Sequence, residues 1–176
     1  NRGLTKFQLK DYYGAIADYT KAIEINPDYV YAYNNRGSAK DKLKDYYGAI
    51  ADYTKAIEIN PNYEKAYFNR GLAKRKINDY YGAIADYKKA IVINPQYAAA
   101  YNNIAFIKRK KEINDNYGAI IYATIAIEID PNDSNYYLNR GVAKENLGDM
   151  KGACDDWRKA SSLGNESTAK WVRDQC

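Results

Sequence analysis

The stretch DYYGAIADYTKAIEINP at residues 11–27 returns letter for letter at residues 45–61. Two variants follow, DYYGAIADYKKAIVINP at residues 79–95 and DNYGAIIYATIAIEIDP at residues 115–131. The copies start 34, 34 and 36 residues apart. A period of this length is typical of architectures that grow by stacking one unit, whereas an enzyme needs its site only once. The sequence therefore predicts a solenoid of similar repeats.

Each period is predicted to form two helices. In residues 30–63, small and apolar side chains recur at helical spacing over residues 30–43 and again over residues 46–59. Lys44-Asp45 interrupts the pattern, and Asn60-Pro61 ends the second segment because proline disfavours helix at the residue before it. The unit is therefore a pair of antiparallel helices joined by a tight turn.

The spacing of small and aromatic residues in these units resembles the tetratricopeptide repeat. In residues 30–63 the family's signature is carried by Tyr33, Gly37, Ala49, Tyr53, Ala56 and Pro61. The resemblance implies an all-α, right-handed superhelical solenoid of stacked helix pairs. It divides the chain into a truncated repeat at 1–29, repeats at 30–63 and 64–97, an irregular repeat at 98–133, a fifth at 134–165 and a capping helix at 166–176.

Four copies carry an arginine directly before the glycine and an aspartate sixteen residues later. The pairs are Arg2 and Asp18, Arg36 and Asp52, Arg70 and Asp86, and Arg140 and Asp156. The irregular repeat has Ile104 and Tyr122 at these positions, so both charges are lost together. Because a half-buried charge needs a partner, we expect an ion pair inside each repeat. Ile104 and Tyr122 are expected to fill the vacated volume.

The amino-acid composition does not favour an enzyme. The chain of 176 residues has no histidine, which removes the commonest general base and metal ligand. Its two cysteines, Cys154 and Cys176, fit no zinc pattern and are predicted to be free thiols, with a mutual disulfide as the less favoured alternative. We therefore expect no enzyme activity, no cofactor and no metal. No apolar run is long enough to span a membrane and no signal is evident, which together with free thiols favours the cytoplasm.

The resemblance implies that the first helix of each pair lines a concave groove. Two residues before the glycine position stands an asparagine in every copy: Asn1, Asn35, Asn69, Asn103 and Asn139. An amide carries both a donor and an acceptor, so a ladder of asparagines could hold an extended main chain whatever its sequence. The alternative is that these asparagines bond only to their neighbours.

The same stripe of the third and fourth repeats carries aromatic and basic residues. The predicted groove residues of this kind, with one further asparagine, are Lys65, Phe68, Leu72, Arg75, Asn102, Phe106 and Arg109. Apolar rings bordered by cations are typical of a peptide anchor site. Residues 64–97 contain seven basic and three acidic residues, which favours an acidic segment as ligand. The alternatives are packing between repeats for the rings and solvated surface for the charges.

These features predict a protein-interaction scaffold that binds an extended, acidic segment of a protein or peptide in its groove. A small-molecule substrate and a membrane are not expected. Nucleic acid is disfavoured because the groove lacks the continuous cationic cover that phosphate binding requires. The alternative function is self-association through an exposed N-terminal repeat.

A clamp for the terminal carboxylate of chaperone tails, as in co-chaperone repeats, is disfavoured. Asn35, Lys65 and Asn69 match it in part. At the position where the clamp needs an asparagine, however, the first three repeats have Leu4, Ser38 and Leu72.

Overall fold

The computed structural model describes residues 2–176, so Asn1, the first asparagine of the predicted ladder, lies outside the described residues. These residues form eleven α-helices and no strand, which confirms the all-α prediction. The first helices of the pairs are α1 (Arg2–Gln8), α3 (Val30–Lys42), α5 (Glu64–Lys76), α7 (Ala98–Lys108) and α9 (Ser134–Asn146). The second helices are α2 (Tyr12–Ile25), α4 (Tyr46–Ile59), α6 (Tyr80–Ile93), α8 (Asn116–Ile129) and α10 (Met150–Ser162), and the capping helix is α11 (Glu166–Gln175).

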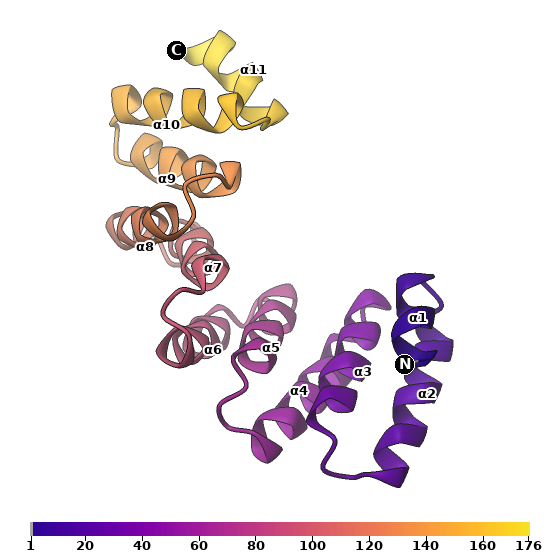
Figure 1. Cartoon of the computed structure of the whole chain (residues 1–176). Helices are drawn as coiled ribbons and strands as arrows, with labels where there is room; N and C mark the ends of the chain where they lie inside the picture. The colour runs from indigo at the N-terminus through magenta and orange to yellow at the C-terminus, as the bar shows by residue number, and fades with distance from the viewer. Residues whose placement is uncertain (1) are drawn as a thin grey trace. The chain divides into compact units, whose positions relative to one another are not determined.

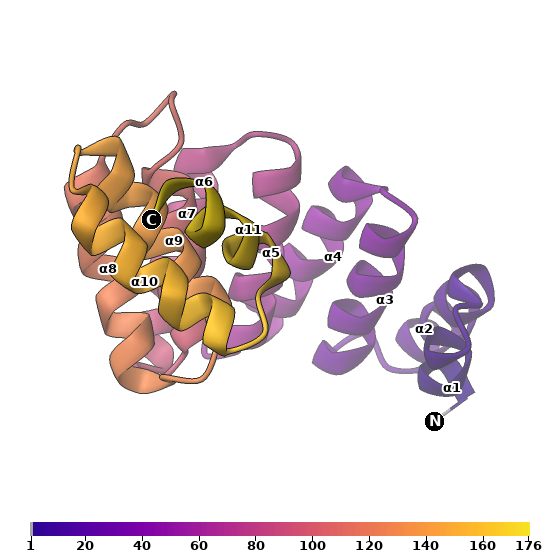
Figure 2. The same ribbon diagram turned by 90° about the horizontal axis from the view of Figure 1, so that it is seen from above.

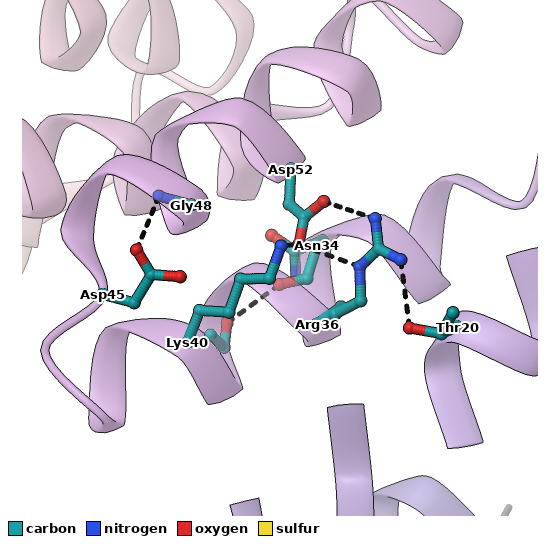
Figure 3. Close-up of polar contacts among 8 residues, drawn as sticks. Thr20, Asn34, Arg36, Lys40, Asp45, Gly48 and Asp52 are labelled. Atoms are coloured by element: carbon teal, nitrogen blue, oxygen red, sulfur yellow. Dashed lines mark hydrogen bonds and ion pairs between the residues drawn. The ribbon is translucent and has the colours of Figure 1, made fainter. Parts of the chain in front are cut away.

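Each second helix begins at an aspartate that caps its backbone. Asp45 Oδ1 accepts a hydrogen bond of 2.9 Å from the backbone N–H of Gly48 (Figure 3). A Cβ added at Gly48 would lie 2.1 Å from Oδ2 of Asp45, so a larger residue would displace the capping carboxylate. The same bond opens the other four second helices, from Asp11, Asp79, Asp115 and Asp149. This accounts for the recurring Asp-x-x-Gly at the start of the repeated stretch.

The helix ends follow from local backbone conformation. Lys44 has a φ of 65°, in the left-handed region, and the next N–H, of Asp45, donates 2.9 Å to the carbonyl of Lys40. Asn60, directly before Pro61, is extended with a φ of −130°. The two helix boundaries predicted for this repeat are therefore confirmed.

The helices group into two compact units, residues 1–94 with α1–α6 and residues 95–176 with α7–α11. Within each unit every helix packs against the next one in the chain, as the ribbon in Figure 1 and its rotated view in Figure 2 show. Each unit is thus a helical repeat array. One uninterrupted right-handed superhelix over residues 1–176 stays a prediction.

An aromatic ring of the second helix packs directly on a glycine of the first. A Cβ added at Gly71 would lie 2.6 Å from Cε1 of the fully buried Tyr87. At Gly141 it would lie 2.5 Å from Nε1 of Trp157, which is 1% exposed. The glycine is therefore required because the two helices approach too closely for any side chain between them.

Gly71→Ala is expected to destabilise the unit of residues 1–94 by about 1–3 kcal/mol, since the added methyl overpacks the core. Urea denaturation of the wild type and the variant measures the difference. In a Tyr87→Leu background the penalty should fall, because the ring that the methyl meets is gone. A Gly71→Ala protein more stable than the wild type would contradict the packing described above, since alanine is otherwise the better helix former.

The irregular repeat replaces its missing ion pair by apolar packing. Ile104 is fully buried, as expected. Tyr122 is half-buried, and its ring centroid lies 6.2 Å from that of Tyr101. Lys108 forms an ion pair with Asp115, the cap of α8.

The prediction of two free thiols is wrong, because Cys154 and Cys176 form a disulfide. Cys154 is buried in α10, where Trp157 belongs to the same core cluster and Trp171 of α11 packs against it. The capping helix α11 packs back on α10, and this contact brings the chain end beside Cys154. The disulfide, which the sequence analysis gave as the less favoured alternative, therefore joins two cysteines that lie 22 residues apart.

Candidate functional site

The row of arginines before the glycines belongs to the scaffold. Arg36 donates from Nε and Nη2 to the carboxylate of Asp52, at 2.9 and 2.6 Å (Figure 3). Nζ of Lys40 lies 2.8 Å from Oδ2 of the same carboxylate, the oxygen that also accepts from Nε of Arg36. Nη1 of Arg36 donates to Oγ1 of Thr20 in the preceding repeat at 3.1 Å. One arginine therefore joins two helices of its own repeat and links that repeat to its neighbour.

The expected pairing inside each repeat is confirmed at all four sites: Arg2 with Asp18, Arg36 with Asp52, Arg70 with Asp86, and Arg140 with Asp156. The hydrogen bond from Arg2, assisted by Lys6, lowers the pKa of Asp18 to about 2. The additional lysine and threonine were not foreseen. The lysine could have been found from the sequence, because one stands three residues after the glycine of each repeat that has the ion pair.

In the unit of residues 1–94, two predicted ladder residues lie on neighbouring first helices. Nδ2 of Asn69 donates to Oδ1 of Asn34 at 3.0 Å, and Nδ2 of Asn34 donates to Oδ1 of Asn35 at 3.3 Å. Asn34 is buried, whereas Asn35 and Asn69 are half-buried. The amides thus form a chain from α3 to α5, and Asn34 is a member that the sequence analysis missed.

Two adjoining hollows open beside these asparagines. The first, of about 120 Å³, is lined by Leu4, Phe7, Tyr19, Asn35 and Ser38. The second, of about 210 Å³, is lined by Phe7, Ser38, Asp41, Lys42, Tyr53, Asn69 and Leu72. Both linings include Phe7 and Ser38, so the two hollows are neighbours on the first helices. Asp41 and Lys42 are lining residues that the sequence analysis did not single out.

The other predicted groove residues of α5 differ in environment. Lys65 is exposed. The ring of Phe68 lies 5.6 Å from that of Tyr87 in the second helix of its own repeat, so it also contributes to packing. Arg75 is half-buried.

In the unit of residues 95–176, the predicted groove residues form a second network. Nε of Arg109 donates to Oδ1 of Asn139 at 3.1 Å, and Nδ2 of Asn139 donates to Oδ1 of Asn102 at 2.7 Å. The guanidinium of Arg109 lies 4.8 Å from the ring centroid of Phe106. Burial without a compensating charge lowers the pKa of Arg109. Four side chains, from α7, from Arg109 directly after it and from α9, therefore come together as one cluster.

Each of the two units contains a hydrogen bond between asparagines of neighbouring first helices, and the two bonds join equivalent positions. Asn34 and Asn102 stand three residues before the glycine position, and each accepts a hydrogen bond from the ladder asparagine of the next repeat. The third repeat has Phe68 at this position, and Asn103 donates instead to the carbonyl of Ala99 in its own helix, at 2.8 Å. The ladder is therefore not uniform along the chain.

Within residues 2–176, no group of three or more His, Cys, Asp or Glu side chains is placed to hold a metal ion. None of the helices described for these residues is long and apolar enough to cross a membrane.

The sequence profile of the tetratricopeptide repeat family matches residues 30–63 and 64–97, and a second profile, described as TPR repeat, matches residues 3–44. Together these matches cover more than half of the chain. The chain belongs to the tetratricopeptide repeat family. No curated protein sequence matches it significantly.

Solved tetratricopeptide repeat structures resemble this chain closely. A crystal structure of MamA superposes with a TM-score of 0.84 at 26% identity, covering 97% of this chain and 98% of that one. MamA residues 41–end from Desulfovibrio magneticus RS-1 superpose with a TM-score of 0.83 at 20% identity, over 93% of this chain and 91% of that one. The first tetratricopeptide domain of Spaghetti (RPAP3), bound to the HSP90 peptide SRMEEVD, gives 0.60 at 30% identity, over 61% and 86%.

Proposed function

We propose that this tetratricopeptide repeat protein is an interaction scaffold that binds an extended segment of a partner protein along its first helices. The observation that carries the proposal is the pair of adjoining hollows across α1, α3 and α5. Their linings combine apolar walls, from Phe7 and Leu72, with the amides of Asn35 and Asn69. Such a mixture suits a peptide, whose main chain needs polar partners and whose side chains need apolar ones.

The amides are arranged to bind a main chain. Asn69 uses its Nδ2 on Asn34, and among residues 2–176 no hydrogen bond to its Oδ1 is observed. That oxygen is therefore free to accept a bond from a peptide N–H. In the second unit, Asn102 and Asn103 are proposed to bind main-chain groups of a ligand, while the buried Asn139 orients Asn102 and Arg109.

An acidic segment is the proposed ligand. The chain has a formal net charge of +5, and Lys65 on α5 is exposed. The Spaghetti (RPAP3) domain, 30% identical over its match, is bound to a peptide containing two glutamates and an aspartate, which supports this ligand class. A terminal-carboxylate clamp of the co-chaperone kind is not part of the proposal, because Leu4, Ser38 and Leu72 stand where an asparagine would be needed.

A displayed peptide library tests the function directly. The wild type is compared with a triple variant, Asn35→Ala, Asn69→Ala and Asn103→Ala. Because each lost amide bond costs about 0.5–1.5 kcal/mol, the triple variant should bind the selected peptides at least about tenfold more weakly. Circular dichroism verifies that the variant is folded, since Asn69 also bonds to Asn34.

The matched control lies on the second helices. Tyr13, Tyr47 and Tyr81 are 75–76% exposed on α2, α4 and α6, and their replacement by serine should leave peptide affinity within about twofold, since exposed surface positions contribute little. Binding that is lost in this control but kept in the asparagine variant would show that the ligand binds the second helices and not the first, which would contradict the proposal. A protein that selects no peptide but associates with rising concentration in sedimentation would favour assembly through the first repeat, where Leu9, the residue after α1, is 75% exposed.

A further inference from the structure

Arg109, in the second unit, is a half-buried arginine whose environment differs from that of the paired arginines of the repeats. It follows α7 directly and is half-buried, with its guanidinium over the ring of Phe106 at 4.8 Å. Its Nε donates to Asn139. No ion pair between Arg109 and a carboxylate occurs within the described residues, and none of their acceptors takes a hydrogen bond from its two terminal NH₂ groups.

Arg140 in the same unit shows what a compensated arginine looks like here. It is held at 2.9 and 2.6 Å by the two oxygens of Asp156, and its side chain is only 20% exposed. A half-buried cation without such a counter-charge is unfavourable, because its lost hydration is not replaced. Burial accordingly lowers the pKa of Arg109. This cost is a reason to expect an external anion.

The side chain of Arg109 is also held in one orientation. Asn139 is 5% exposed, and its Nδ2 donates to Asn102, which turns its Oδ1 toward Arg109. Lys110 approaches the same Phe106 ring, at 5.3 Å. An arginine fixed in this way loses little conformational entropy when it binds a ligand.

We propose that the two terminal NH₂ groups of Arg109 anchor a carboxylate of the bound segment. The planar fork of a guanidinium matches the two oxygens of a carboxylate. The carboxylate comes either from an Asp or Glu side chain or from a chain terminus. The proposal rests on the function proposed above and adds a carboxylate contact in residues 95–176. In the third repeat, by contrast, Arg70 and Lys74 are both paired with Asp86.

The first test needs no peptide. Sodium acetate is titrated into the full chain at constant ionic strength, with chloride as the balance, and the Nε–H resonances of the arginines are followed by NMR. The Arg109 resonance should shift and saturate, whereas that of Arg140, whose fork is occupied, should not. If Arg109 moves no more than Arg140, the anchor is refuted even if no peptide is ever found.

The second test uses peptides selected from the library. Arg109→Met should weaken their binding at least about tenfold, as expected when one partner of a desolvated charge pair is removed. Arg109→Lys should retain part of the affinity. Arg109→Met should lose less stability than Arg140→Met, because it breaks one hydrogen bond to Asn139, whereas Arg140→Met leaves the buried Asp156 without its guanidinium partner. Replacing Glu by Gln in the peptide should abolish the difference between wild type and Arg109→Met, and amidating the peptide terminus distinguishes the two sources of carboxylate.

The outcomes separate the two proposals. Peptides that bind wild type and Arg109→Met equally would refute the anchor and leave the scaffold function standing. Saturable acetate binding at Arg109 without any selected peptide would support the anchor and count against peptide binding.

Discussion

Asp86→Ala is expected to lower the free energy of unfolding of residues 1–94 by about 3–5 kcal/mol, because it leaves buried positive charge without a partner. Asp86 is 3% exposed. Its oxygens lie 2.7 Å from Arg70 and 2.8 Å from Lys74, and Arg70 continues to Thr54 of the preceding repeat at 3.0 Å. The carboxylate of Asp86 therefore links the two helices of its repeat, and it orients Arg70, which contacts the preceding repeat.

Urea denaturation followed by circular dichroism measures this effect. Glu58→Ala is the matched control, since Glu58 also forms an ion pair, with Lys55 at 3.1 Å, but is 59% exposed in its side chain. The control should cost less than about 1 kcal/mol, as exposed pairs do. Replacing Arg70 and Lys74 by Met and Asp86 by Leu together should recover much of the loss. An Asp86→Ala effect no larger than that of Glu58→Ala would show that the paired charges do not stabilise the repeat.

Cys176→Ser is expected to destabilise residues 95–176 by about 3 kcal/mol. The disulfide restricts the unfolded chain by closing a loop between residues 22 apart, and a loop of that size stabilises a fold by about this amount. The bridge joins Cys154 of α10 to the residue that follows α11, across 22 residues. Cys176 is exposed, so the serine itself adds no buried polar group. Without the bridge, α11 is held on α10 by packing, which includes Trp171 against Trp157 at 5.2 Å, and by a hydrogen bond of 3.2 Å from Arg158 to the carbonyl of Cys176.

Thermal unfolding and hydrogen exchange of α11 provide the measurement. A thiol reductant should lower the unfolding temperature of the wild type to that of Cys176→Ser and leave the variant unchanged. The unit of residues 1–94 serves as the internal control, because both cysteines of the chain lie outside it. Equal stability of the oxidised and reduced wild type would contradict the predicted role of the bridge.

Part of the site was predictable because two of its features are periodic. The pairing of Arg70 with Asp86 was predictable because the arginine and the aspartate are either both present in a repeat or both absent from it. The placement of Asn35, Asn69 and Leu72 on first helices follows from their distance to the glycine. The use of each asparagine did not follow, because a hydrogen bond between repeats depends on how one helix pair is rotated against the next.

The sequence by itself determined the helices, their boundaries and the ion pairs inside each repeat. The reason is that a spacing of 3.6 residues, a capping aspartate and a proline act over a few positions along one chain. Only the tertiary structure decided which arginine has no carboxylate and which cysteines meet. Those outcomes depend on side chains from different helices converging within a few ångströms, as Asn139 does on Arg109 and Cys154 on the chain end.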